Sequence, residues 1–81
     1  MIVTVKFFAS YRDLLGEEQL LIETEEGVTV GDVLELLKDR FPILRDQGYM
    51  PLTACNLTHV SKKHVLADGD EMAIFPPVSG G

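Results

Sequence analysis

The sequence predicts an α+β domain in which one main helix packs on one face of a mixed β-sheet. Three observations lead to this prediction. Residues 2–8 alternate in the manner of a strand, and residues 30–41 repeat apolar side chains at the helical period. Residues 71–75 alternate again, directly after a turn sequence. The order is therefore two strands, a helix and further strands around one core.

The N-terminal strands are predicted over residues 2–8 and 19–24, where β-branched and other apolar side chains are frequent. Between them, Ser10 is expected to cap a short helical turn over residues 11–15. Gly16 is expected to end that turn in the left-handed conformation that glycine adopts without strain. The first three segments thus predict a hairpin with a helical turn inside its connection.

The main helix has clear signals at both ends. Thr29 is a good N-cap residue, and Asp32 places negative charge at the positive end of the helix. Pro42 disfavours helical geometry at the residue before it and so marks the end. One apolar stripe faces the core: Val30, Val33, Leu34, Leu37 and Phe41.

The C-terminal part follows a loop that contains Gly48. A third strand is predicted over residues 52–57, and a short turn or strand over residues 61–66. Asp68-Gly69-Asp70 is a strong turn signal, and residues 71–75 form the last strand. This order of elements is that of a ubiquitin-like, or β-grasp, roll. The residues expected to be buried between sheet and helix are Phe7, Val33, Leu34, Leu37 and Ile74.

Length and composition are those of one ordinary globular domain. The chain has 81 residues, of which 46% are hydrophobic and 25% charged. We expect residues 1–76 to form the β-grasp domain and residues 77–81 to form a flexible C-terminal tail that ends in Gly-Gly.

Charge and hydropathy argue against several classes of partner. The net charge is −6, and Lys62-Lys63 is an isolated basic pair, so nucleic-acid binding is not expected. No apolar run approaches the roughly 20 residues of a membrane span, and residues 1–8 do not resemble a signal peptide. Cys55 is the single cysteine, which excludes an internal disulfide and fits a reducing compartment. The sequence therefore predicts a cytoplasmic protein without a membrane partner.

No side-chain constellation in the sequence predicts catalysis or a metal site. Cys55, His59 and His64 are the residue types that bind transition metals, but their spacing crosses a strand and its turn, where side chains alternate faces. Cys55 also lacks a neighbouring base that would make it a nucleophile. A buried cysteine and two surface histidines are expected instead.

The C-terminal sequence FPPVSGG, residues 75–81, predicts that the chain end itself is the reactive group. The two prolines fix φ and lack N–H donors, so the chain leaves the sheet stiffly after Phe75. The four residues beyond the prolines reach about 13–14 Å when extended, and glycines let another backbone approach closely. The carboxylate of Gly81 is the predicted reactive group. The residues expected to position it are Pro76, Pro77, Val78, Ser79 and Gly80.

Four segments, which are distributed along the whole chain, resemble a known family. They are VKFFASYRDLLG, TVGDVLELL, CNLTHV with Asn56, and LADGDEMAIFPPVSGG. In these segments the sequence resembles the small subunits of molybdopterin synthase, a family of ubiquitin-like sulfur carriers. Cys55 and His59 stand where other residues are expected.

The resemblance implies a cycle of activation at Gly81. A ubiquitin-activating-type adenylyltransferase would use ATP to adenylate the carboxylate, and a sulfur donor would displace AMP to leave a thiocarboxylate. The tail would then enter the active site of the large catalytic subunit, within a heterotetramer, and pass sulfur to cyclic pyranopterin monophosphate to make molybdopterin. The resemblance implies no permanently bound cofactor and no catalytic side chain in this chain.

Alternatives remain open at this point. The same activated Gly81 would serve a ubiquitin-like modifier joined to lysines, or a thiamine-pathway sulfur carrier, and a β-grasp binding module would have an incidental tail. For docking on the large subunit, an apolar patch on the exposed sheet face is expected to include Phe8 and Phe75. Equally, Phe75 is expected to be a core residue if its side chain faces the helix.

Overall fold

The computed structural model describes residues 1–47 and 51–77. Gly48 therefore lies outside the described residues. The elements in the described ranges are β1 (Ile2–Phe7), α1 (Ser10–Leu15), β2 (Gln19–Glu23), α2 (Val30–Arg40), a 3₁₀ turn η1 (Pro42–Leu44), β3 (Leu52–Cys55), β4 (Thr58–His59) and β5 (Glu71–Phe75).

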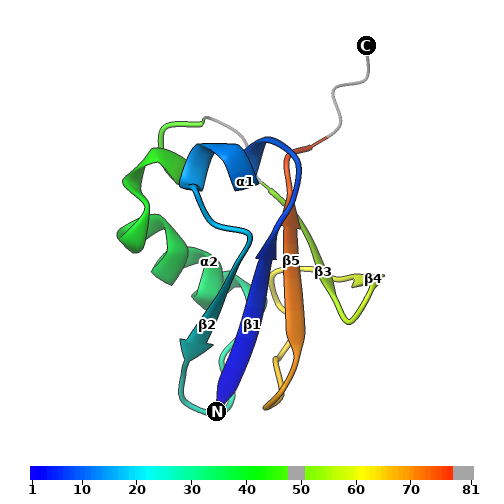
Figure 1. Cartoon of the computed structure of the whole chain (residues 1–81). Coiled ribbons are helices and arrows are strands. Elements are labelled where there is room, and N and C mark those ends of the chain that lie inside the picture. The colour runs from blue at the N-terminus through cyan, green and yellow to red at the C-terminus, as the bar shows by residue number, and fades with distance from the viewer. Residues whose placement is uncertain (48–50, 78–81) are drawn as a thin grey trace.

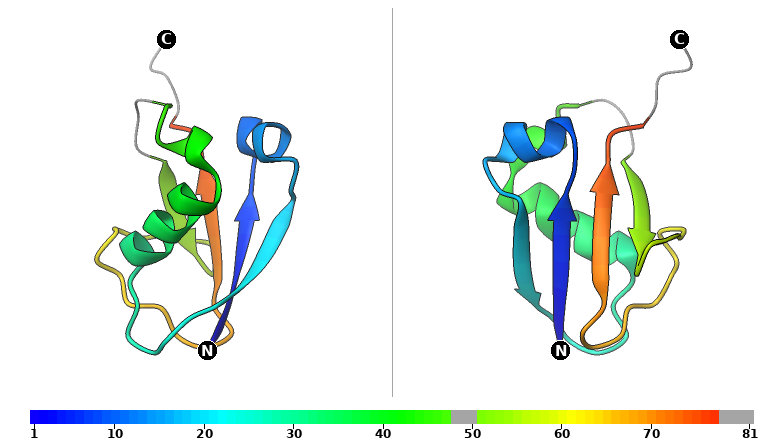
Figure 2. Two further views of the ribbon diagram at one scale, coloured as in Figure 1. Left: turned by 90° about the vertical axis from the view of Figure 1, so that its left-hand side faces the viewer. Right: turned by 45° about the vertical axis from the view of Figure 1, so that its right-hand side comes forward.

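The strands form one mixed sheet in the order β2-β1-β5-β3-β4. The central pair β1–β5 is parallel, and the pairs β1–β2, β3–β5 and β3–β4 are antiparallel. The long helix α2 crosses one face of this sheet, while α1 lies at the end of the sheet where β1 ends (Figures 1 and 2). The predicted α+β fold, a β-grasp with one main helix on a mixed sheet, is confirmed.

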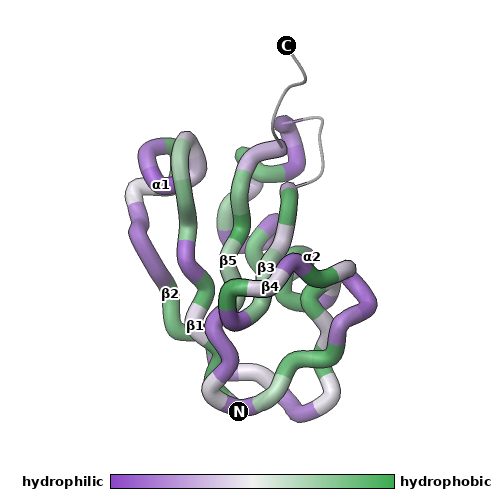
Figure 3. The backbone as a smooth tube through the Cα atoms, turned by 90° about the vertical axis from the view of Figure 1, so that its right-hand side faces the viewer, coloured by the Kyte–Doolittle hydropathy of each residue, from purple (hydrophilic) through white to green (hydrophobic). Residues whose placement is uncertain are grey.

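Strand register decides which side chains face α2. Val5 is paired with Leu20 on one side and with Met72 on the other, and Met72 is paired in turn with Cys55. Side chains that are directly paired point to the same face of a sheet, so this row forms part of the inner face. Figure 3 shows both apolar and polar residues along β1 and mainly apolar residues along β5. No helix within residues 1–47 or 51–77 covers the opposite, outer face (Figure 2).

The core lies between the inner face and α2. All five residues expected there are buried, and the T-shaped contact between Phe7 and Phe41, with ring centroids 6.2 Å apart, joins the strand to the end of the helix. Tyr11 of α1 is also buried, which the sequence pattern did not predict. The buried cluster comprises Val3, Val5, Phe7, Tyr11, Val30, Val33, Leu34, Leu37, Cys55, Leu66, Met72 and Ile74.

The main helix begins as predicted. Thr29 is the N-cap, and its hydroxyl accepts a hydrogen bond of 3.1 Å from the backbone N–H of Asp32. The Asp32 carboxylate accepts one of 2.9 Å from the backbone N–H of Thr29, which completes a capping box. The helix ends at Arg40, and Pro42 opens the 3₁₀ turn that follows.

The predicted cap of the first helix is wrong. Ser10 is the first helical residue, and the N-cap is Ala9, which has φ of 53° and makes no side-chain cap hydrogen bond. The chain reverses so sharply after β1 that the N–H groups of Tyr11 and Arg12 already bond to Phe8 and Ala9 carbonyls. A side-chain cap is therefore not needed. Gly16 ends the helix at φ of 72°, as predicted.

The predicted third strand over residues 52–57 is too long. It ends at Cys55, and Asn56 and Leu57 form a two-residue turn into β4, with Cys55 paired to Thr58. Both turn residues have positive φ, 49° and 72°, as a type I′ hairpin turn requires. Asparagine tolerates this conformation, whereas leucine gives no turn signal, which explains the incorrect boundary. No helix in the two described ranges is long and apolar enough to cross a membrane.

Candidate functional site

The last strand, β5, ends at the end of the sheet that is opposite Met1 (Figure 1). Phe75 is the last residue of β5 and is paired with Leu52 of β3. Pro76 and Pro77 follow outside the strand, and neither can donate a ladder hydrogen bond. The predicted stiff exit therefore begins at a defined place on the sheet. Four of the predicted site residues lie outside the described residues: Val78, Ser79, Gly80 and Gly81.

Phe8 and Phe75 lie together at this exit. Their rings are stacked, with centroids 4.9 Å apart and planes 16° from parallel. Phe8 follows β1 and is 40% exposed, and its backbone N–H donates to the carbonyl of Ile74. Phe75 is half-buried and is not part of the buried cluster, because Ile74, its neighbour, takes the inward position. The alternative expectation that Phe75 is a core residue is wrong.

Two more side chains extend this aromatic pair into a patch. Leu52, paired with Phe75, is exposed, and the imidazole ring of His59 lies 6.4 Å from the Phe75 ring. We call these four residues, Phe8, Leu52, His59 and Phe75, the outer-face patch. Large exposed apolar groups that gather at one place mark a surface that is suited to bind another molecule. The patch lies directly beside Pro76, where the chain leaves the sheet.

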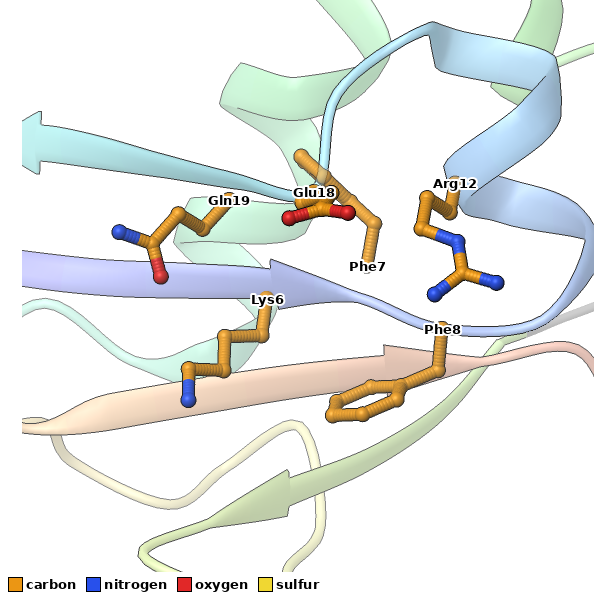
Figure 4. A pocket seen from close by; sticks show the side chains of 6 residues that line it. All are labelled: Lys6, Phe7, Phe8, Arg12, Glu18 and Gln19. Atoms are coloured by element: carbon orange, nitrogen blue, oxygen red, sulfur yellow. The ribbon is translucent and has the colours of Figure 1, made fainter.

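A shallow hollow of about 220 Å³ borders the patch. It is lined by Lys6, Phe7, Phe8, Arg12, Glu18 and Gln19. Figure 4 shows the side chains of Lys6 and Arg12 extending from β1 and α1 on two sides of the hollow. Lys6 also forms an ion pair of 3.3 Å with Glu71. The apolar patch thus has cationic groups at its border although the chain as a whole is acidic.

Of the three residues considered as metal ligands, His59 lies apart from the other two. His59 lies on the outer face beside Phe75, whereas Cys55 is buried at the inner face, as the alternation argument predicts. His64 lies near Cys55, and the third neighbour is Asp70 in place of His59. The set Cys55, His59 and His64 is therefore not assembled.

Cys55 has the properties of a protonated thiol. Burial raises its pKa to about 11, and the negative charge of Asp70 and a hydrogen bond from the thiol to that carboxylate act in the same direction. His64 lies near the thiol as a neighbouring base that the sequence did not predict, and the raised pKa of Cys55 is what disfavours a thiolate in the folded chain.

Sequence reasoning missed two features of this region. Leu52 and His59 belong to the outer-face patch, and Asp70 lies with Cys55 and His64. The sequence contains part of the information, because alternation within a strand shows which of its residues share a face. The pairing of β3 with β5 that brings them together was not visible in the local pattern.

The fold defines a class. A mixed five-stranded sheet in the order β2-β1-β5-β3-β4 with one main helix, α2, on one face is the architecture of a ubiquitin-like, or β-grasp, protein. The ThiS family model matches residues 5–81, so the chain belongs to the ThiS family. The family relationship expected from the sequence is confirmed.

Individual relatives agree with this assignment. The molybdopterin synthase sulfur carrier subunit of Escherichia coli (strain K12) is 36% identical over 81 residues, which cover 98% of this chain and 99% of that protein. The crystal structure of Haloferax volcanii small archaeal modifier protein 1 matches with a TM-score of 0.84 at 26% identity, covering 95% and 98% of the two chains. A complex of subunits 1 and 2 of the molybdopterin-converting factor from Helicobacter pylori contains a chain with a TM-score of 0.68 at 26% identity, covering 100% of both chains.

Proposed function

We propose that this chain is the sulfur-carrying small subunit of a molybdopterin synthase. The observation that carries the proposal is the position of the outer-face patch directly beside the exit of β5 into Pro76 and Pro77. A partner that binds the patch receives the tail at a fixed starting point. The family assignment and the similarity to sulfur carrier subunits support the same conclusion.

The proposed chemistry takes place at the carboxylate of Gly81. A carboxylate is a poor electrophile until one of its oxygens becomes part of a good leaving group. An adenylyltransferase of the ubiquitin-activating type transfers AMP from ATP to this carboxylate and releases pyrophosphate. A sulfur donor then displaces AMP and leaves a thiocarboxylate. This chain supplies the acyl group, and its partners supply the catalytic side chains.

Docking on the large catalytic subunit is the second part of the proposal. Phe8 and Phe75 provide the apolar centre of the contact, and Lys6 and Arg12 provide a polar border, which is the usual arrangement of a protein interface. The tail then enters the active site of the large subunit and passes sulfur to cyclic pyranopterin monophosphate. In the Helicobacter pylori complex a related chain is bound to subunit 2 of the converting factor.

Deletion of Gly81 tests the chemistry. The deletion withdraws the carboxylate by about 3.3–3.6 Å along an extended chain. Because a displacement of about 1 Å can lower a rate on the order of a hundredfold, sulfur transfer should be lost. The assay combines the activating enzyme, ATP, a sulfur source, the large subunit and the pterin precursor, and intact mass records thiocarboxylate formation. Circular dichroism checks that the variant is folded. Normal turnover by the folded variant would refute the sulfur-carrier proposal.

Substitution of Phe75 tests the docking surface. Phe75→Ala removes half of the aromatic stack and should weaken binding to the large subunit by about 2 kcal/mol or more, or roughly 30-fold in Kd. Leu21→Ala is the matched control, because Leu21 is an exposed apolar residue on β2, separated from β5 by β1. Calorimetry with the purified large subunit measures both. Equal affinities of the two folded variants for the large subunit would contradict a docking role for Phe75.

A second function is favoured by one comparison. The structural similarity to a small archaeal modifier protein supports a role as a ubiquitin-like modifier that is joined to lysines through Gly81. The two functions share the adenylation step and differ in the acceptor. Peptide mass spectrometry of native cells distinguishes them: isopeptide-linked Gly81 on other proteins identifies a modifier, and a thiocarboxylate on the free chain identifies a sulfur carrier.

A further inference from the structure

Three side chains from three separate segments converge at the end of β5 that is remote from the tail. Cys55 is the last residue of β3, His64 lies in the loop after β4, and Asp70 directly precedes β5. One ligand atom from each, a sulfur, an imidazole nitrogen and a carboxylate oxygen, lies within 4.8 Å of the other two. Cys55 is buried, Asp70 is half-buried and His64 is exposed, so the cluster opens to solvent on the histidine side.

The backbone at each of these residues is held in place. The N–H of His64 donates to the carbonyl of Ser61 at 3.1 Å, and its own carbonyl accepts from the N–H of Val30 at 2.9 Å. Cys55 is fixed by its pairing with Met72 across β3 and β5. Rotation of the exposed imidazole about its side-chain bonds is therefore the main adjustment that the cluster can make.

The carboxylate of Asp70 is oriented by two donors. Its Oδ1 accepts from the side-chain amide of Asn56 at 3.0 Å, and its Oδ2 accepts from the backbone N–H of Ala67 at 2.7 Å. The Cys55 thiol also donates to this carboxylate, and loss of the thiol proton frees that lone pair for another partner. Hydrogen bonds of this kind to a carboxylate are the usual outer support of a metal ligand.

We propose that Cys55, His64 and Asp70 form a binding site for a divalent transition-metal ion of the Zn²⁺ type. Thiolate, imidazole and carboxylate are the ligands that Zn²⁺ takes in proteins, at bond lengths of about 2.0–2.3 Å. Tetrahedral ligands at those lengths are about 3.3–3.8 Å apart. The three ligand atoms already lie within 4.8 Å of one another, so metal binding requires them to approach by about 1–1.5 Å at most. Three protein ligands leave a fourth position for water.

The charges favour a bound cation. In the metal-free chain the Cys55 thiol is protonated and donates a hydrogen bond to the carboxylate of Asp70. On binding, the Sγ–H bond breaks, the proton passes to the buffer, and a bond forms between Sγ and the metal ion. The dication then neutralises one thiolate and one carboxylate together, which removes the repulsion between them.

The site is independent of the function proposed for the tail. β5 spans Glu71–Phe75, so the cluster and the exit at Phe75 are separated by about 13 Å at the usual rise of a strand. A bound ion would join the β3–β4 hairpin to the turn before β5 and stabilise the folded chain, since an ion that binds the folded state shifts the unfolding equilibrium.

The test uses the untagged full chain and Co²⁺ as a spectroscopic probe in place of Zn²⁺. Three measurements are made: absorbance for a thiolate-to-cobalt charge-transfer band, calorimetry in two buffers for release of one proton, and Tm with increasing Zn²⁺. The principal variant is His64→Ala, because that side chain is exposed and its loss leaves the core unchanged. The matched control is His59→Ala, an exposed histidine outside the cluster.

The expected result is a charge-transfer band, one proton released and a Tm that rises with Zn²⁺ for the wild type and for His59→Ala. Removal of a ligand in His64→Ala should weaken metal binding by at least about the 10- to 100-fold that loss of an outer-shell partner costs. Cys55→Ala should abolish the band. Absence of the band in the wild type would overturn the proposal, and so would equal affinities of His64→Ala and the wild type, or an equal loss in His59→Ala.

Discussion

Truncation of Leu37 to alanine tests how α2 is oriented on the sheet. Leu37 is 0% exposed and lies in the buried cluster, whereas Leu36, its neighbour in the same helix, is 47% exposed. Leu37→Ala removes the same atoms as Leu36→Ala, so helix propensity and composition are matched between the two variants. The difference between them isolates the effect of burial.

The expected magnitudes follow from the two environments. A fully buried leucine costs about 2–5 kcal/mol when it is truncated, because both transfer energy and packing are lost. For Leu36 the loss should be about 1 kcal/mol or less, since much of its surface already contacts water. At about 0.05–0.15 kcal/mol per residue the whole domain has about 4–12 kcal/mol of stability, so Leu37→Ala removes a large share of it.

Urea unfolding followed by circular dichroism and by tyrosine fluorescence measures both variants, and agreement of the two probes establishes a two-state transition. Each kcal/mol corresponds to about 4–8 °C in Tm for a domain of this size, so calorimetry gives an independent value. A loss below about 0.5 kcal/mol for Leu37→Ala, or equal losses for the two variants, would refute the assigned face of α2.

Three further predictions concern single local features. Thr29→Ala should lose about 0.5–2 kcal/mol of unfolding free energy by breaking the capping box, and Thr29→Ser, which keeps the hydroxyl, should stay close to the wild type in urea curves. Gly16→Ala should cost about 1–2 kcal/mol because φ is 72°, and a smaller loss for Gly16→Asn in the same assay would confirm the conformational cause. In a chelating buffer, the unfolding free energy should fall as pH rises from about 9 to about 11, because the Cys55 thiol ionises at a pKa of 9.0 when unfolded and about 11 when folded. Cys55→Ala should show a smaller fall over that range, and an identical fall would disprove the contribution of this thiol.

Features that depend on neighbouring residues in the chain were predictable from the sequence. The start of α2 at Thr29, its apolar stripe and the end of α1 at Gly16 all depend on contacts within about four residues. The same is true of the alternating strands β1 and β5. Their side chains already determine which face can be buried, so the β-grasp arrangement followed from the order of elements.

Local sequence preference gave a wrong prediction in two short segments, each of which can adopt either of two conformations. Ser10 is a good cap residue, but the backbone carbonyls of Phe8 and Ala9, just after β1, accept hydrogen bonds from the first N–H groups of the helix instead. Leu57 fits a strand by composition, yet pairing of Cys55 with Thr58 forces it into the turn, where it is 96% exposed. In both places the path of the chain between elements outweighed residue preference.

The sequence by itself predicted the main elements and the buried residues Phe7, Val33, Leu34, Leu37 and Ile74, and it contains the residues on which the proposed chemistry depends. Tertiary structure alone decided which distant side chains meet: the stack of Phe8 on Phe75, and the convergence of Cys55, His64 and Asp70. The physical reason is strand register. The parallel pairing of β1 with β5 and the antiparallel pairing of β5 with β3 place residues far apart in the chain side by side, and a shift of one residue would turn each of them to the opposite face.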